Sequence, residues 1–306
     1  MTTNLTVKNK KIKKSGADRV FQISTIIISI FVLLITLYPL YFIIIASISD
    51  PQRVYNGYVT LLPMGFNTEG YARILGDSSF WRSYLNSVIY TIAGTSIAVL
   101  LSMTIAFPLS RKYFKGRGVI NVILLIPMYF SGGLIPTYIT MQSLGLTGSP
   151  WSPILLGSFS VFNVIVARTF LAGNIPQELD EAAYVEGCSY IRYFVSFVMP
   201  LSKAVIAVLI LYYGISIWND YFNAMIYLDK PELFPLQLRL YDVLIDAQIA
   251  GSMFSDEDIG YATYMRNLSD SIKYGMIVVS ALPMMVLYPF LQKYFVKGVM
   301  IGSLKG

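Results

Sequence analysis

The sequence has few charged residues and few of the residues that most often carry out chemistry. Of its 306 residues only 13% are charged, none is histidine, and Cys188 is the single cysteine. Without histidine the chain lacks the commonest general base and the commonest metal ligand. One cysteine cannot form a disulfide within the chain, and Cys188 is interpreted as an ordinary small residue. These absences make a metal centre or a hydrolytic active site a poor expectation.

Apolar sequence is what the chain has in abundance. Hydrophobic residues make up 55% of it and the mean hydropathy is +0.60, whereas a soluble domain of this length needs a more polar surface. A helix of about 20 residues crosses a bilayer, and the first apolar run is too long for a signal peptide. We therefore predict an all-α polytopic membrane protein with six transmembrane helices. They are expected over residues 21–48, 86–110, 119–139, 153–171, 204–228 and 274–291.

The distribution of charge predicts how these helices are oriented. Basic residues crowd the tail 1–20, the link that begins at Arg111, and the tail 292–306, whereas segment 229–272 is acidic on balance. Short basic links belong on the cytoplasmic side, so both termini are expected there. Segments 49–85 and 229–272 are then external, and their apolar content predicts folded caps, with a helix over residues 236–249 in the second. The net charge of +6 is explained by this orientation, and no nucleic-acid partner is expected.

A segment between the fourth and fifth apolar runs, residues 172–202, carries a distinctive pattern. Glu181-Ala182-Ala183 is followed after three residues by Gly187, and after nine more by Phe197-Val198-Met199-Pro200. Pro176 is suited to open a helix, and glycine is suited to the left-handed position that closes one. The pattern predicts two short helices, the second over residues 189–197, with Gly187 between them.

This pattern resembles the coupling loop of the membrane subunits of binding-protein-dependent ABC importers. Other stretches look like carbohydrate-importer permeases, most of all those for complex oligosaccharides in gram-positive bacteria: residues 82–87, 108–111, 132–136 and 218–219. The end of the chain, residues 297–306, is similar to the tail of the second membrane subunit of maltose importers. The similarity extends over nearly the whole chain from Phe21. Phe197 and Met199 stand where isoleucine and leucine are usual, and both remain apolar.

The resemblance implies a type I ABC importer permease fold, with residues 86–291 as the transmembrane core, in a bacterial cytoplasmic membrane. Its implied partners are a second homologous permease, two ATPase subunits that use ATP and Mg²⁺, and an external solute-binding lipoprotein. This chain would bind no cofactor and would carry a sugar or oligosaccharide. The implied ATPase-coupling residues are Glu181, Ala182, Ala183, Glu186, Gly187 and Pro200. The implied residues of an extended tail at the ATPase interface are Gly302, Lys305 and Gly306.

The fifth apolar run carries polar residues at helical spacing. Tyr212, Ser216, Asn219 and Asn223 recur every three or four residues and are expected on one helical face. Such a face either lines a path for a solute or bonds to another helix. We favour the path, with Trp218 beside it and Asn163 as a further lining residue. Asp220 is expected to pair with a neighbouring subunit or to lie near the outer interface. Gly132-Gly133 marks either a bend or a place of close packing.

Other classes of function fit the sequence less well. A membrane enzyme needs a nucleophile with its base, or paired carboxylates, at membrane depth. The chain has no G-x-x-x-x-G-K stretch for ATP, so that energy must come from another chain. A channel or a secondary transporter would leave residues 181–200 unexplained, and no internal repeat is visible. A permease for a non-sugar solute in the same superfamily is the main alternative.

Overall fold

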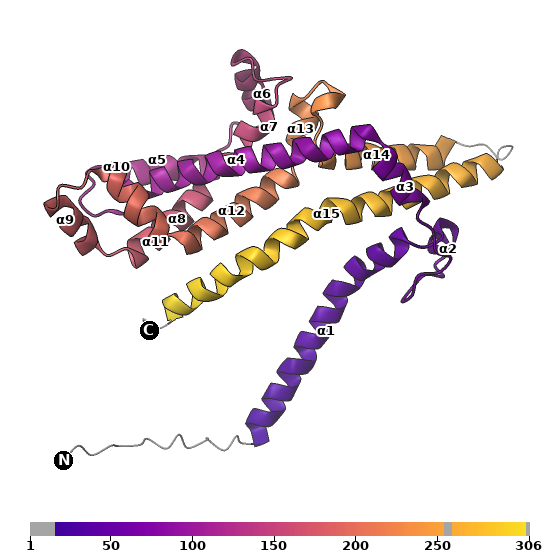
Figure 1. Cartoon of the computed structure of the whole chain (residues 1–306), viewed down its shortest axis with the longest axis horizontal. Coiled ribbons are helices and arrows are strands. Elements are labelled where there is room, and N and C mark those ends of the chain that lie inside the picture. Colours follow the sequence, from indigo (N-terminus) through magenta and orange to yellow (C-terminus); the bar gives the residue numbers. More distant parts are fainter. Residues whose placement is uncertain (1–15, 254–258, 304–306) are drawn as a thin grey trace.

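The computed structural model describes residues 16–253 and 259–303. Every regular element within these residues is a helix. In chain order they are α1 (Gly16–Ser47), α2 (Pro51–Tyr55), α3 (Glu69–Gly76), α4 (Ser78–Ser110), α5 (Arg117–Tyr129), α6 (Leu134–Ser143), α7 (Trp151–Leu156), α8 (Val161–Asn174), α9 (Gln177–Val185), α10 (Tyr190–Tyr193), the π-helical turn η1 (Phe194–Val198), α11 (Met199–Leu201), α12 (Lys203–Trp218), α13 (Phe222–Tyr227), the 3-10 turn η2 (Pro231–Leu233), α14 (Leu236–Met253) and α15 (Ile259–Ser303). Helices α9, α10 and α11 lie at one end of the bundle and α2 and α3 at the other, with α4 running between them (Figure 1).

Three helices of the described residues are long and apolar enough to cross a membrane: α1, α4 and the stretch Asn267–Phe290 of α15. Two pairs of helices qualify together but are bent. The pair α5 and α6 is bent by 113°, and the helices over Tyr190–Leu201 and Lys203–Trp218 are bent by 81°. Counting each bent pair as one span gives up to five spans. Helix α8 is apolar but shorter.

The expected third span, residues 119–139, is therefore broken rather than continuous. The break lies at Gly133, whose φ is +86°, a value that glycine adopts without strain. A Cβ added at Gly133 would meet nothing within 4 Å, and one at Gly132 would meet only the side chain of Pro136 at ordinary contact distance. Within this chain the two glycines thus serve the bend, and the alternative of close packing is wrong.

The expected fourth and fifth spans are also interrupted. Residues 157–160 separate α7 from α8, and the Ser160 hydroxyl accepts a hydrogen bond from the Asn163 N–H, which caps α8. In the fifth span, α12 ends at Trp218 and α13 starts at Phe222. We expected a single helix over 204–228, and the side chain of Asp220 explains why the helix is interrupted. Its carboxylate accepts the Asn223 N–H at 3.1 Å and so begins a new helix.

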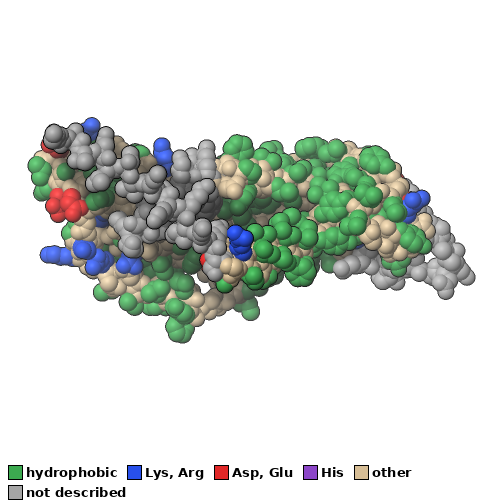
Figure 2. All heavy atoms as spheres, turned by 90° about the horizontal axis from the view of Figure 1, so that it is seen from below, with side chains coloured by type: hydrophobic (Ala, Val, Ile, Leu, Met, Phe, Trp, Pro, Cys, Tyr) green, Lys and Arg blue, Asp and Glu red, His purple; other side chains and the backbone are tan. Residues whose placement is uncertain are grey.

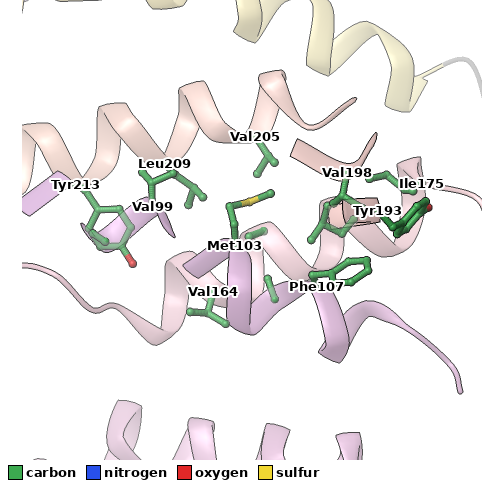
Figure 3. Close-up of a cluster of buried hydrophobic side chains, with 14 residues drawn as sticks. Val99, Met103, Phe107, Val164, Ile175, Tyr193, Val198, Val205, Leu209 and Tyr213 are labelled. Atoms are coloured by element: carbon green, nitrogen blue, oxygen red, sulfur yellow. The ribbon is translucent and has the colours of Figure 1, made fainter. Parts of the chain in front are cut away.

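The largest cluster of buried apolar side chains joins α4, α8 and α12. Small residues on α4, among them Ala98 and Ala106, let the three helices approach closely. Met103 is fully buried at the centre of the cluster, and Phe107 continues it toward Tyr193 of α10 (Figure 3). One rigid core therefore extends from the middle of α4 to the end of the bundle that carries α9.

The two segments that we expected to be external form helices where the structure describes them. Segment 49–85 holds α2, α3 and the first turns of α4, and the helix expected from Leu236 is α14. Side chains of α4 hold the start of segment 229–272: Asn86 donates to the Glu232 carbonyl at 2.8 Å, and Tyr90 donates to the Leu233 carbonyl at 2.9 Å.

Within the described residues, helix α1 is buried only at its end. Its residues from Gly16 to Tyr41 are exposed, whereas Ile45, Ala46 and Ser47 are buried. The Phe42 ring meets that of Tyr274 on α15 edge-on, with centroids 6.4 Å apart. The beginning of α1 therefore stands away from the other helices (Figure 1).

The C-terminal tail differs from its expected conformation. We expected an extended strand from Gly298, but α15 continues as a helix to Ser303. Extending an existing helix costs far less than starting one, and the apolar residues 299–301 do not interrupt it. Gly302 lies in this last turn, whereas Lys305 and Gly306 lie outside the described residues.

Candidate functional site

The turn after α9 is built around Gly187, as predicted. Its φ of +70° is left-handed, and three backbone bonds close the helix end. The N–H groups of Glu186, Gly187 and Cys188 donate to the carbonyls of Ala182, Tyr184 and Ala183 at 3.1, 3.0 and 2.9 Å. A side chain at Gly187 would strain this backbone.

The second half of the segment begins with a cap and contains a π-helical turn. The Ser189 hydroxyl accepts the Arg192 N–H at 3.3 Å, so that α10 starts at Tyr190. The predicted single helix over 189–197 instead passes into η1 at Phe194 and then α11. Pro200 in α11 has no N–H to donate to the preceding turn, which favours such a local change of helical register.

The outer face of the segment is apolar and exposed. Tyr184, Val185 and Ile191 are 73%, 83% and 79% exposed. Beside them lies a hollow of about 360 Å³ between α9 and the residues of α10 and η1. Its lining includes Leu179, Ala182, Ala183, Glu186, Gly187, Cys188, Arg192, Tyr193 and Phe197. Charged side chains gather at this end of the molecule, and hydrophobic ones cover the face between the two ends (Figure 2). We call the segment 172–202 the coupling surface.

A second hollow, of about 380 Å³, lies where α12 passes the break between α7 and α8. Its lining is Leu156, Gly157, Phe159, Ser160, Phe162, Asn163, Tyr212, Tyr213, Ile215 and Ser216. No lining side chain is charged. Aromatic rings stand next to hydroxyl and amide groups, and the Phe162 and Tyr212 rings are 6.3 Å apart. We call this the solute hollow.

The hydroxyl of Tyr213 holds one wall of the solute hollow in place. It lies 2.7 Å from the Ser102 hydroxyl of α4 and accepts the Ser160 N–H at 3.2 Å. Three segments, α4, α12 and the break before α8, thus meet at one buried phenol. Because the backbone at a helix break has N–H groups to satisfy, Tyr213 stabilises the break itself.

Comparisons with known proteins show the family. No protein-family model matches the chain. It is 36% identical over 293 residues to Protein LplC of Bacillus subtilis (strain 168), which covers 95% of this chain and 96% of the relative. It is 35% identical over 274 residues to the polygalacturonan/rhamnogalacturonan transport system permease protein YtcP of the same organism, covering 89% and 94% of the two chains. The chain belongs to the sugar ABC transporter permeases.

Solved structures agree with this assignment. A chain of a bacterial ABC transporter involved in the import of the acidic polysaccharide alginate is 32% identical to this permease, with a TM-score of 0.81, over 93% of this chain and 99% of that one. A chain of a bacterial alginate transporter in complex with an alginate pentasaccharide-bound periplasmic protein shares the fold, at 16% identity and a TM-score of 0.55.

Five of the six predicted coupling residues lie together in this permease. Ala182, Ala183, Glu186 and Gly187 line the hollow of the coupling surface, and Glu181 is exposed on the same helix. Pro200 is exposed in α11 and does not line that hollow.

The predicted path residues divide into two groups. Tyr212, Ser216 and Asn163 come together in the solute hollow. Trp218 does not, since it is buried in another apolar cluster and its indole N–H donates to the Ser280 carbonyl at 3.0 Å. Two residues turn a helix by about 200°, so that Trp218 points away from Ser216.

Asn219 and Asn223 do not continue the polar face. The Asn219 amide donates to the Ile215 carbonyl of its own helix at 2.9 Å. Asn223 belongs to α13, and its amide donates to the Asp220 carboxylate at 2.8 Å. Asp220 therefore bonds within this chain, to Asn223, and its expected place beside a neighbouring subunit or near the outer interface stays a prediction.

The sequence did not reveal the buried charged residues that lie beneath the coupling surface. Arg111 was noted for its charge and as part of the stretch 108–111, yet its guanidinium lies buried beside Asp180 of α9. Tyr193 is buried nearby, and that burial together with the Asp180 carboxylate raises the pKa of its hydroxyl. Buried charge next to two tyrosines, Tyr113 and Tyr193, has no local sequence signature, because the residues come from three separate segments.

Proposed function

We propose that this permease forms half of the translocation path of an ATP-driven importer and that the coupling surface docks on an ATPase subunit. The observation that carries the proposal is the exposed apolar face of Tyr184, Val185 and Ile191, next to the hollow at Gly187. Apolar side chains of this size on a polar end of a membrane protein are typical of a protein interface. The small side chains of Ala182 and Ala183 allow a partner to approach closely.

The solute hollow is proposed as this subunit's share of the path for an oligosaccharide. The rings of Tyr212 and Phe162 offer flat faces to sugar rings, and Asn163 and Ser216 offer hydrogen-bonding groups to hydroxyls. The hollow brings no charge to the sugar. We therefore assign recognition of ring faces and hydroxyls to this hollow, and any recognition of acidic groups to other parts of the importer.

The membrane arrangement follows from the charge pattern. We place six spans in a bacterial cytoplasmic membrane, with each of the three interrupted segments, α5–α6, α7–α8 and α12–α13, counted as one span. The last turns of α15 lie toward the end of the molecule that carries the coupling surface (Figure 1). That position and the basic residues of both tails support placing both termini on the cytoplasmic side.

The partners complete the importer. A second homologous permease supplies the other half of the path, and an external solute-binding protein delivers the oligosaccharide. Two ATPase subunits bind and hydrolyse ATP with Mg²⁺, and this chain binds no cofactor of its own. Gly302, Lys305 and Gly306 are assigned to the contact between the tail and the ATPase subunits.

Site-specific cross-linking in the assembled complex tests the docking. In a Cys188→Ser background, Val185→Cys should cross-link to the ATPase subunit, in a yield that changes when ATP is added. Val122→Cys, which is 60% exposed on α5, is the matched control and should give no such product. Equal yields from both positions would contradict docking at the coupling surface.

A further inference from the structure

The end of α4 is joined to α9 by a buried ion pair. Arg111 Nε lies 3.0 Å from Asp180 Oδ2, and the two side chains are 1% and 8% exposed. Arg111 Nε makes no hydrogen bond, which means that its N–H does not point at the carboxylate oxygen. The pair is therefore held by charge more than by a straight hydrogen bond. Arg111 directly follows the last residue of α4, and Asp180 lies in the first turn of α9.

Arg111 also contacts the segment that leads into α9. Its Nη1 donates to the Ile175 carbonyl at 3.0 Å, at the end of α8. Its guanidinium stands over the Phe107 ring, 5.1 Å from the ring centroid. One side chain thus touches α4, the end of α8 and α9, and so joins α4 to the coupling surface.

The pair is not explained by stability. Nη2 of Arg111, Oδ1 of Asp180 and the Tyr193 hydroxyl have no hydrogen-bond partner among the described residues, although all three atoms are buried. Buried charges that are only partly satisfied stabilise a fold little, and apolar residues of similar size often replace them without loss. A role in fixing the relative position of the helices accounts better for the burial of both charges.

Helix α4 connects this pair to the solute hollow. Ser102, which contacts the Tyr213 hydroxyl, precedes Arg111 on α4 by nine residues, a rise of about 14 Å at 1.5 Å per residue. Met103, Ala106 and Phe107 between them are packed in the largest buried cluster (Figure 3). Close packing stiffens this stretch of α4 on both sides of Pro108, which lies inside the helix.

We propose that the Arg111–Asp180 pair fixes α9 to α4, so that a displacement of the coupling surface reaches the Tyr213 contact at the solute hollow. Without the pair, the loops before and after α9 would absorb the displacement. Arg111 and Asp180 are thus positioning residues for energy coupling. This inference rests on the proposed docking of an ATPase at the coupling surface.

The test replaces both charges at once in the complete complex, reconstituted in vesicles. Arg111→Met with Asp180→Leu removes the pair without leaving a single buried charge. ATP hydrolysis in the absence of solute should persist, whereas solute transported per ATP hydrolysed should fall about tenfold, within the usual range for coupling between two sites. The exposed pair Arg73–Glu69, changed to two glutamines, is the control and should keep the parental ratio. A parental ratio in the Arg111/Asp180 double variant would overturn the proposal.

A distance measurement separates positioning from a merely structural role. Spin labels at Val185→Cys on α9 and Leu101→Cys on α4, in the Cys188→Ser background, report the separation of the two helices. The separation should be the same with and without ATP in the parent and should change with ATP in the double variant. A change in the parent, or none in the variant, would overturn the proposal. If the double variant does not assemble, Asp180→Asn takes its place with the same expectations.

A third variant distinguishes failure of this inference from failure of the proposed function. If Gly187→Val transports normally, docking at the coupling surface is wrong. If Gly187→Val uncouples transport while the Arg111/Asp180 double variant keeps the parental ratio, only the role of the pair is wrong.

Discussion

Gly157 lies directly against the side chain of Ile217. A Cβ built at Gly157 would stand 2.7 Å from Cγ1 of Ile217, and one at Gly94 would stand 2.8 Å from Cδ1 of the same residue. The single side chain of Ile217 therefore fills the space that two glycines leave, one on α4 and one at the break after α7. Of these three residues, Gly157 also lines the solute hollow.

The first prediction follows from that contact. Gly157→Ala should destabilise the assembled permease by about 1–3 kcal/mol, because the core has no room for an extra methyl group. Combined with Ile217→Ala, it should cost less than the sum of the two single changes, because the second change removes the atoms that clash. Thermal unfolding of the purified complex measures both effects. Gly173→Ala on α8, where an added Cβ meets nothing within 4 Å, is the control. Equal melting temperatures for Gly157→Ala and the parent would disprove the close contact.

The second prediction concerns the turn of the coupling surface. Gly187→Val forces a branched side chain into a left-handed backbone, and Glu181→Lys reverses a charge on the exposed face of α9. Both variants should reach the membrane and lose transport. Gly116 also has a positive φ of +87° but lies outside the coupling surface, so that Gly116→Val should retain more transport than Gly187→Val. Normal uptake by Gly187→Val and Glu181→Lys, at normal expression, would rule out their coupling role.

The third prediction assigns the path to the solute hollow. In the Cys188→Ser background, Ser216→Cys should react with a water-soluble thiol reagent at a rate that the solute slows and that ATP changes. Asn223→Cys, which tests the residue bonded to Asp220, should show neither dependence. Ala224→Cys, at a fully buried position, gives the baseline. If Asn223→Cys is protected by the solute and Ser216→Cys is not, the path runs along α13 instead.

The fourth prediction concerns the C-terminal tail. Deleting the residues after Val299 removes the last turn of α15 and the residues beyond it, including Lys305. Because the tail is proposed to contact the ATPase subunits, solute-stimulated ATP hydrolysis should fall about fivefold or more, while membrane insertion persists. Replacing Met300, Ile301 and Ser303 by alanine keeps the helix and the three assigned residues, and this variant is the control. Parental hydrolysis by the truncated complex would show that the tail makes no functional contact.

Local patterns predicted the parts of the coupling surface that local forces determine. The positive φ of Gly187 follows from the need to end α9, and the helix at Leu236 follows from its own sequence. The prediction of one continuous helix for the fifth span was wrong because residue spacing does not show where a side chain bonds to the backbone. Residue spacing alone places Ser216 and Asn223 on one face, but the Asp220 carboxylate takes the Asn223 N–H and restarts the helix. A short polar side chain that competes for the backbone overrode the periodic pattern.

Contacts between distant segments lay beyond the sequence patterns. Arg111 and Asp180 come from segments on either side of two broken spans, so that no spacing relates them. The same holds for Tyr213, whose hydroxyl meets Ser102 and the backbone at Ser160. Apolar residues neighbour all of these positions in the sequence, and only the packing of α4 against α8 and α12 selects which polar groups meet.

The attachment of α1 at one end has a consequence for the lipid around this permease. Among the described residues, burial of α1 is confined to its last turn, at Ile45, Ala46 and Ser47, and most of the helix is exposed. Tilt is then set by the match between its apolar length and the thickness of the hydrocarbon layer, or by a neighbouring subunit. In vesicles of longer-chain lipid α1 should stand more upright, whereas the angles among α4, α8 and α12 should stay unchanged. Membrane thickness thus acts on this chain through one helix, at a distance from both hollows.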